Sequence, residues 1–142
     1  MADLTGSCVL LADRHHGLSE GVRGLLETAF DSVFMVGDEP SLLEGSQRLR
    51  PPVVIIDLAL AAGDVNGLLG RVAERSPQSK VVALTVHDEP SVADAALRAG
   101  AHGVVLKRAI ATDLLEAIGE VLAGRQYVSP GLAGGRCGSA AP

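Results

Sequence analysis

The sequence is nearly free of aromatic residues: among 142 residues it has no tryptophan, one tyrosine and two phenylalanines. The hydrophobic core must therefore be built from Val, Leu, Ile and Ala, and a flavin held between aromatic rings is disfavoured. Cysteine is also scarce. The two cysteines, Cys8 and Cys137, have neither the spacing of metal ligands nor the number needed for a disulfide framework, which fits a reducing cytoplasm.

The sequence also lacks an excess of positive charge and long apolar runs. A formal net charge of -5 and a pI near 5.3 provide no electrostatic footprint for nucleic acid or an anionic membrane. No apolar run reaches the length of a membrane span, and Asp57 interrupts the longest one. We therefore expect a soluble cytoplasmic protein with no membrane contact, in which another segment makes any contact with DNA.

Five short apolar runs, rich in β-branched residues, are present along the chain. Each is apolar almost throughout, which is typical of strands buried on both faces of a parallel sheet. Segments with helical spacing lie between them, clearest over 18–30 and 110–122, and Pro90 and Gly100 mark the ends of another helix. This alternation predicts right-handed crossovers and a doubly wound three-layer α/β sandwich. The runs are SCVLLA from Ser7, SVFMV from Ser32, PVVIID from Pro52, KVVALT from Lys80 and GVVLK from Gly103.

The composition changes near the end of the sequence. After Tyr127 the composition shifts, and from Ser129 the chain reads SPGLAGGRCGSAAP, which is too poor in apolar residues to build a core. The length suits a single domain of ordinary size. We therefore expect one folded domain over residues 1–126, followed by a tail or the start of a linker over residues 127–142.

Four of the five apolar runs end in a polar or charged residue: Asp13, Asp57, Thr85 and Lys107. In an open α/β sheet, ligands and chemistry collect at the carboxyl ends of the strands, beside the point where the strand order reverses. These four side chains are therefore predicted to share one edge of the sheet. Two acids, a hydroxyl and a lysine together are a stronger signal than any single motif.

These residues and their surroundings resemble a response-regulator receiver domain of bacterial two-component signalling, over about residues 7–124. The matching stretches are LLAD with Asp13, VVIIDL with Asp57, VVALT with Thr85 and GVVLK with Lys107. The phrases HDEPSVADAALRAGAHGVVLK and LLEAIGEVLAGRQYVSP are similar to the NarL/FixJ-type subfamily, whose members usually continue into a LuxR-like helix-turn-helix. The resemblance implies a flavodoxin-like (βα)5 fold with five parallel strands in the order 2-1-3-4-5.

The resemblance also implies a role for each site residue. Asp57 would accept a phosphoryl group from a histidine kinase or phosphotransfer protein, Lys107 would supply a cation, and the hydroxyl of Thr85 would bond a phosphoryl oxygen. Mg²⁺ would be held by Asp13, Asp57 and the backbone carbonyl of Ala59. The chain would be a homodimer without enzymatic activity or an organic cofactor. It would control transcription, reaching DNA only through an effector domain outside this sequence.

Arg14 departs from the family pattern, because an acid usually follows the position of Asp13. The formal charges of Asp13, Arg14, Asp57 and Lys107 sum to zero. Exchanging an acid for a base at about 5 Å from a divalent ion costs roughly 3 kcal/mol even at the dielectric of water. We therefore expect Mg²⁺ binding to be weak or absent. We expect the guanidinium of Arg14 to lie among the neighbouring carboxylates, forking onto Asp57 or Asp13 in place of the missing cation, and the alternative is that it points into solvent.

Two further departures put a conventional switch in doubt. The loop DLALAAGDVNG lacks the usual proline after the acceptor and is longer, and Val104 stands where the family has an aromatic switch residue. Three hypotheses follow: a receiver phosphorylated at Asp57, a phosphorylation-independent pseudo-receiver that acts as a protein-interaction module, and a flavodoxin-like ligand-binding or enzymatic domain. The third is disfavoured because no glycine-rich phosphate loop follows the first strand.

Overall fold

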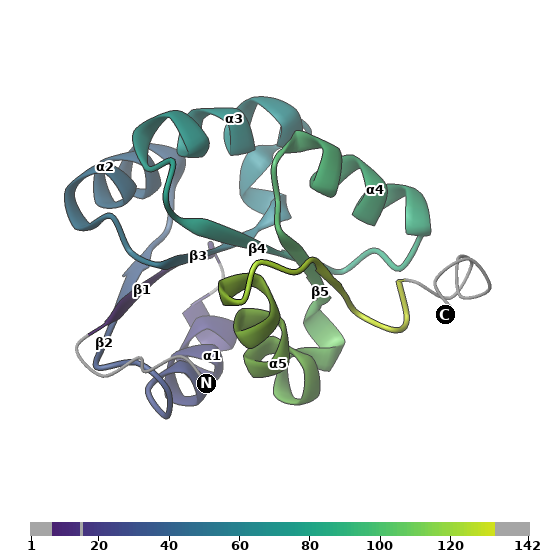
Figure 1. Ribbon diagram of the computed structural model, residues 1–142, viewed down its shortest axis with the longest axis horizontal. Helices are drawn as coiled ribbons and strands as arrows, with labels where there is room; N and C mark the ends of the chain where they lie inside the picture. The colour runs from purple at the N-terminus through teal and green to yellow at the C-terminus, as the bar shows by residue number, and fades with distance from the viewer. Residues whose placement is uncertain (1–6, 15, 133–142) are drawn as a thin grey trace.

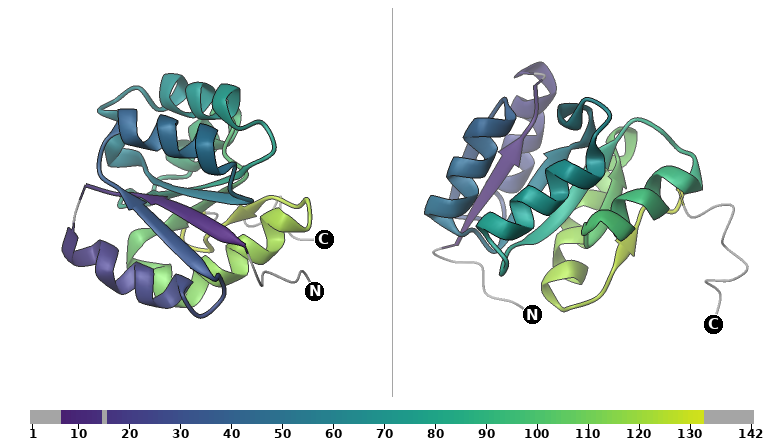
Figure 2. Two further views of the ribbon diagram at one scale, coloured as in Figure 1. Left: turned by 90° about the vertical axis from the view of Figure 1, so that its left-hand side faces the viewer. Right: turned by 90° about the horizontal axis from the view of Figure 1, so that it is seen from above.

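A computed structural model describes residues 7–14 and 16–132 of the chain, and for 16–19 the backbone alone. A parallel β-sheet forms the middle of three layers, with helices α2, α3 and α4 on one face and α1 and α5 on the other (Figures 1 and 2). The strands are β1 Cys8–Ala12, β2 Ser32–Val36, β3 Val53–Asp57, β4 Lys80–Thr85, β5 Gly103–Leu106 and β6 Tyr127–Val128. The helices are α1 His16–Leu26, α2 Glu39–Leu49, α3 Val65–Arg75, α4 Pro90–Ala99 and α5 Ile110–Leu122, with short 3-10 helices η1 Leu58–Ala61 and η2 Lys107–Ala109.

The sheet has six strands in the order β2-β1-β3-β4-β5-β6, and every neighbouring pair is parallel. The expected flavodoxin-like order of the first five strands is confirmed, but the expected number of strands is too low by one. β6 pairs with β5 in the register Gly103↔Tyr127 and Val104↔Val128. A two-residue strand is too short to produce a hydrophobic pattern, which explains why the sequence did not reveal it.

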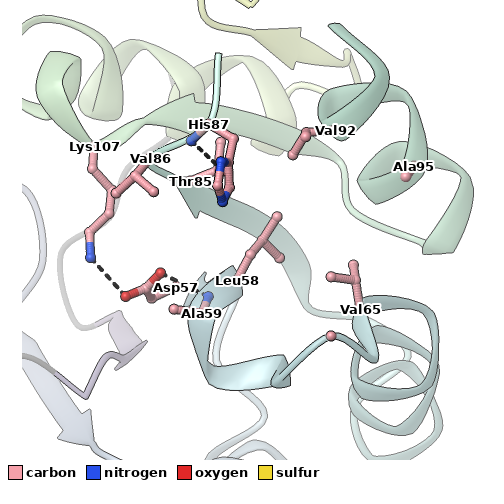
Figure 3. Close-up of a pocket in the computed structure, with 11 residues that line it drawn as sticks. Asp57, Leu58, Ala59, Val65, Thr85, Val86, His87, Val92, Ala95 and Lys107 are labelled. Atoms are coloured by element: carbon pink, nitrogen blue, oxygen red, sulfur yellow. Dashed lines mark hydrogen bonds and ion pairs between the residues drawn. The ribbon is translucent and has the colours of Figure 1, made fainter. Parts of the chain in front are cut away.

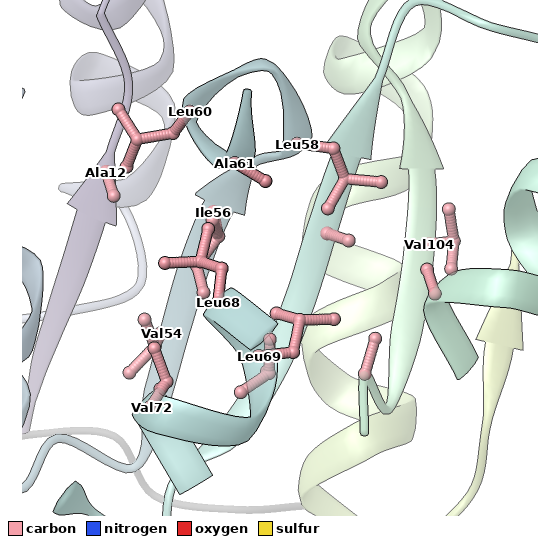
Figure 4. Close-up of a cluster of buried hydrophobic side chains, with 14 of the residues drawn as sticks. Ala12, Val54, Ile56, Leu58, Leu60, Ala61, Leu68, Leu69, Val72 and Val104 are labelled. Carbon is pink, nitrogen blue, oxygen red and sulfur yellow. The ribbon is translucent and has the colours of Figure 1, made fainter. Parts of the chain in front are cut away.

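The apolar runs of β1, β3, β4 and β5 are continuous because helices cover both faces of these strands, whereas β2 lies at the edge of the sheet and is partly exposed. Side chains alternate between the two faces, so in β3 Val53 and Ile55 belong to the cluster under α1 and α5. Val54 and Ile56 belong to the cluster under α2, α3 and α4. Figure 4 shows this second cluster, where Leu68, Leu69 and Val72 of α3 lie over the sheet.

Capping residues set the helix boundaries. The carboxylate of Asp38 accepts the backbone N–H of Ser41 at 2.8 Å and starts α2, and Asp64 caps α3 through the N–H of Gly67 at 3.1 Å. Pro90 is the first residue of α4, and Gly100 ends it at a φ of 123° that favours glycine. This helix confirms the expectation based on those two residues.

Residues 127–132, which we call the C-terminal strap, pack against the domain and do not form the tail that was expected. Ser129 and Leu132 are both 0% exposed, and Leu132 belongs to the core cluster on the α4 side of the sheet. Backbone and side-chain hydrogen bonds, Leu132 and the partly buried Tyr127 and Val128 hold the strap. So few apolar residues in a stretch rich in Gly, Ser and Pro do not predict a packed segment. Residues 133–142, with Cys137 among them, lie outside the described part of the chain. Among the described residues, no helix is long and apolar enough to cross a membrane.

Candidate functional site

The ends of four strands bring Asp13, Asp57, Thr85 and Lys107 to the same edge of the sheet. Asp57 ends β3, which lies between β1 and β4, so its side chain is central. Asp13 directly follows β1, Thr85 ends β4, and Lys107 directly follows β5. Figure 3 shows Lys107 reaching toward Asp57 across this edge, with Thr85 on the neighbouring strand.

Lys107 forms ion pairs with both acidic residues. Its Nζ lies 2.7 Å from Oδ2 of Asp57 and 3.7 Å from Oδ2 of Asp13. The exposed fractions of these side chains are 9% for Lys107, 2% for Asp57 and 1% for Asp13, so the charges are largely removed from water. In such surroundings an ion pair depends on close geometry and further hydrogen bonds.

Asp57 has the polar contacts that an ionised carboxylate requires. Its Oδ1 accepts the backbone N–H of Ala59 at 3.1 Å, while its Oδ2 faces Lys107. Burial alone would raise the pKa of Asp57, but the hydrogen bond and charge of Lys107, with the N–H of Ala59, outweigh it and hold the pKa below its ordinary value. The carboxylate is therefore charged at neutral pH, as a nucleophile must be.

A cavity of about 470 Å³ opens beside Asp57, between η1 and α3 on one side and α4 on the other. Thr85, Asp57 and Lys107 supply its polar groups, and Oγ1 of Thr85 accepts the backbone N–H of His87 at 3.0 Å. Sequence reasoning located these polar groups but missed the apolar walls. The only local signal was the helical spacing of Val92 and Ala95. The walls include Leu58, Val65, Val86, Val92 and Ala95.

Arg14 lies at the bend that follows Asp13, and its side chain is exposed. Among the described residues, no hydrogen bond or ion pair joins its guanidinium to Asp13 or Asp57, so the expected fork onto these carboxylates is not formed. Arg14 faces solvent at this bend. The expected position among the carboxylates, where it would stand in for a cation, is therefore wrong, and the alternative of a solvent-facing side chain holds.

The chemistry of the donor groups fits a hard cation such as Mg²⁺, which takes carboxylate and carbonyl oxygens. Asp13 and Asp57 bring two carboxylates together. The backbone carbonyl of Ala59 accepts the N–H of Ala62 at 3.3 Å within η1, and Lys107 already contacts both carboxylates. A cation would have to share its ligands with these partners. Within the described ranges no cluster of three His, Cys, Asp or Glu residues suited to a metal ion is found.

The loop after Asp57 adopts a defined shape that the sequence did not predict. It forms η1, which ends at Ala62 with a φ of 51°, followed by Gly63 with a φ of 91°. Asp64 then caps α3. The longer loop is thus absorbed into a 3-10 helix that carries the N–H of Ala59 to the carboxylate of Asp57.

A doubly wound sheet with buried acids and a lysine at its carboxyl edge is typical of receiver-type signalling domains, and comparison with known sequences identifies the family. The family described as "Response regulator receiver domain" matches residues 9–119. The chain belongs to this family.

Individual relatives agree with this assignment. The chain is 31% identical to the transcriptional regulatory protein DegU of Brevibacillus brevis, over 86% of this chain and 52% of that protein. It is also 31% identical to a probable transcriptional regulatory protein NarL of Mycobacterium tuberculosis, over 92% of this chain and 61% of that protein. A LuxR-family response regulator from Aurantimonas sp. SI85-9A1 superposes with a TM-score of 0.83 at 25% identity, covering 94% of this chain and 96% of that one. The chain thus spans about half to three fifths of these two curated relatives.

Proposed function

We propose that this receiver domain is controlled by phosphorylation of Asp57, with a histidine kinase or phosphotransfer protein as the donor. The observation that carries the proposal is the state of Asp57: a buried, ionised carboxylate at the edge of an open cavity, 2.7 Å from the amine of Lys107. Receiver domains are signalling proteins, and this role needs no further catalytic activity.

In the proposed transfer, a carboxylate oxygen of Asp57 attacks the phosphorus of a phosphohistidine. The new O–P bond forms as the N–P bond breaks, and the donor imidazole leaves with the electron pair. The ammonium of Lys107 offsets the negative charge that collects beside Asp57, and the hydroxyl of Thr85 can donate to a phosphoryl oxygen. The N–H of Ala59 holds the second carboxylate oxygen in place.

In this proposal Mg²⁺ binds weakly at the site of Asp57. Asp13, Asp57 and the carbonyl of Ala59 would hold it, and when bound it would neutralise charge on the transferred group. Arg14 stands beside Asp13 where a further acid would strengthen this binding. Its positive charge opposes the cation, and its exposure leaves that effect partly screened by solvent.

Binding of a phosphoryl mimic tests the proposal. Beryllofluoride with Mg²⁺ is titrated into the ¹⁵N-labelled protein, and the amides of Ala59, Thr85 and Lys107 are followed by NMR. We expect saturating shifts at these three positions, and none with the matched variant Asp57→Asn. Wild-type spectra that stay unchanged up to saturating metal and beryllofluoride would contradict the proposal.

The second candidate function is a phosphorylation-independent pseudo-receiver that acts as a protein-interaction module. The observations that favour it are Arg14, a base beside Asp13 where a further acid would strengthen cation binding, and Val104, which stands at the position of the family's aromatic switch residue. If this candidate is correct, partner binding will be the same for wild type and Asp57→Asn. Partner binding that requires an intact Asp57 would exclude it.

We further propose that the chain acts as a homodimer in the cytoplasm and controls transcription through an effector domain. The names of the curated relatives and the share of their length that the chain covers support the effector domain. In a related case, RcsB of Salmonella enterica was solved bound to promoter P1flhDC in the presence of phosphomimetic BeF3-, and this chain is 27% identical to it. Analytical ultracentrifugation with and without beryllofluoride tests the dimer, and a monomer under both conditions would contradict it.

A further inference from the structure

The C-terminal strap is hydrogen-bonded to β5 directly before Lys107. The backbone N–H of Ser129 donates to the carbonyl of Val104 at 2.9 Å. The backbone N–H of Leu106 then donates to Oγ of Ser129 at 3.0 Å. Leu106 is the last residue of β5, and Lys107 is the next residue in the chain. Ser129 therefore contacts the backbone from which the lysine of the site extends.

The hydroxyl of Ser129 joins this strand end to helix α5. It accepts from Leu106 and donates to Oδ2 of Asp113 in the first turn of α5, at 2.9 Å. Ser129 is 0% exposed, so in the docked strap its hydroxyl is bonded to these two groups and not to water. A buried hydroxyl that both accepts and donates a hydrogen bond holds its two partners in one arrangement. Leaving these buried polar groups without a hydrogen bond costs free energy.

The strap also fits closely against Leu106. A Cβ added at Gly131 would lie 2.7 Å from Cδ1 of Leu106, so only glycine allows this approach without a shift. Leu132, 0% exposed, joins the apolar cluster that contains Leu106 of β5 and Ala96 of α4. The strap therefore cannot change position without disturbing the end of β5.

We propose that Ser129 is a positioning residue for Lys107, and that docking of the strap is coupled to phosphorylation of Asp57. A phosphoryl group on Asp57 gives the ammonium of Lys107 new oxygens to pair with in place of the 2.7 Å contact to Oδ2. The resulting movement acts on Leu106 and its bond to Ser129. Because such coupling is reciprocal, the state of the strap also sets how well the site holds a phosphoryl group. This inference rests on the proposed function.

The first test compares Ser129→Ala with Ser79→Ala. Ser79 is also buried and bonded, to Ser76 and Pro51, but it lies just before β4 at the opposite edge of the sheet. Each variant loses the two hydrogen bonds of a buried serine hydroxyl. Only Ser129→Ala removes a contact with β5. We expect Ser129→Ala to weaken binding of Mg²⁺-beryllofluoride about fivefold or more, within the usual range of coupling between sites. Ser79→Ala is expected to bind as wild type at a similar loss of Tm.

The second test needs neither metal nor phosphoryl group. Hydrogen exchange of the Leu106 amide, which donates to Ser129, is measured in wild type and in Asp57→Asn. We expect Asp57→Asn to speed this exchange more than that of the β3 core amides, because Lys107 loses the closer of its two charged partners, at 2.7 Å, and the end of β5 loosens. Exchange that changes equally at all these amides would show only global destabilisation and would overturn the coupling.

The outcomes separate the inference from the proposed function. If wild type binds the mimic but Ser129→Ala binds it equally well, the inference is overturned and the proposed function stands. If wild type binds no mimic and accepts no phosphoryl group, the proposed function fails, and the coupling to phosphorylation fails with it.

Discussion

Lys107 is the residue on which the charge balance of the site depends. It is the cation that contacts both buried carboxylates, at 2.7 Å and 3.7 Å. Removing one partner of a buried ion pair leaves a charge without compensation, which is far more costly than losing an exposed pair. The stability and the proposed chemistry of the site therefore share one side chain.

Substituting Lys107→Met tests this dependence. We expect it to lower the free energy of unfolding by about 3–5 kcal/mol at pH 7, because the buried carboxylates of Asp13 and Asp57 both lose their contact with the ammonium of Lys107. Asp57→Asn, which keeps the contact between Lys107 and Asp13, is expected to cost clearly less. Urea unfolding followed by circular dichroism measures both. Equal losses for the two variants would contradict the assigned role of Lys107.

Arg14 offers a second prediction about charge, concerning metal affinity. Arg14→Asp changes the local charge by two units beside Asp13, and we expect Mg²⁺ affinity to rise about tenfold or more even with screening by solvent. The matched control is Arg98→Asp, an identical charge change in the last turn of α4. Isothermal titration calorimetry gives both values. If the two variants bind Mg²⁺ alike, then net charge, not the position of Arg14, governs affinity.

His102 makes stability depend on pH. Its Nδ1 accepts the backbone N–H of Val81 at 3.0 Å, which requires the neutral ring. Burial first, and then the charge of Lys80, lower its pKa from the ordinary value of 6.5. The unfolded chain therefore takes up the proton first as pH falls. The stabilisation is fully present above pH 6.5 and is lost as pH falls through the lowered pKa of the folded state.

The variant His102→Asn tests this account, because its Oδ1 can accept the same N–H but does not titrate. We expect the free energy of unfolding of wild type to fall between pH 7.5 and pH 5 by clearly more than that of His102→Asn, as measured by urea denaturation. His87→Asn, a change at an exposed histidine, serves as the control. A wild-type pH dependence that His102→Asn retains in full would place its origin elsewhere.

At the scale of elements, the longer buried strands and helices could be predicted from the sequence, and the shortest strand and 3-10 helix could not. The interiors of strands β1, β3 and β4 are apolar because helices cover both faces, and α4 is bounded by Pro90 and Gly100. The strand ends also predicted a shared edge, where ion pairs join Asp13, Asp57 and Lys107. Thr85 lines the same cavity as Asp57 and Lys107. β6 and η1 depend on contacts with distant backbone or on one side chain, such as the bond from Ala59 to Asp57. No local pattern encodes such contacts.

The placement of Arg14 shows a similar limit within the site. The sequence indicated that a base replaces an acid, and electrostatics predicted the consequence for a metal ion. Asp13 takes the buried position after β1, and the chain bends at Arg14, whose side chain is exposed. The resemblance to the family indicates the role of a position in the site. It does not predict the orientation of a side chain that the family does not usually have at that position.

The strap yields a prediction at the element scale. Leu132 is fully buried, so Leu132→Ala is expected to lower the free energy of unfolding by about 2–5 kcal/mol through lost burial and a cavity. Leu49→Ala, at a leucine that is 36% exposed, is expected to cost much less. Chemical denaturation of both variants in the same buffer measures the difference. Equal, small losses of unfolding free energy for the two variants would show that residues 127–132 are a tail that does not stabilise the domain.

At the scale of the whole molecule, the sheet separates two core clusters and presents one functional edge. The cluster under α2, α3 and α4 reaches the cavity beside Asp57 and also includes Leu132 of the strap. A change at Asp57 is therefore connected, through β5 and this cluster, to the segment that leads out of the domain. This arrangement suits a domain whose proposed task is to pass a chemical signal to another part of a longer protein.

The central claim, that Asp57 accepts a phosphoryl group, is tested most directly by intact-mass spectrometry. The protein is incubated with Mg²⁺ and a phosphorylated phosphotransfer protein or the small donor phosphoramidate, alongside Asp57→Asn. The account predicts that wild type gains the mass of one phosphoryl group, that borohydride reduction and peptide mapping locate it at Asp57, and that Asp57→Asn gains none. Wild type that remains unmodified with both donors, or that is modified at another residue, would contradict it.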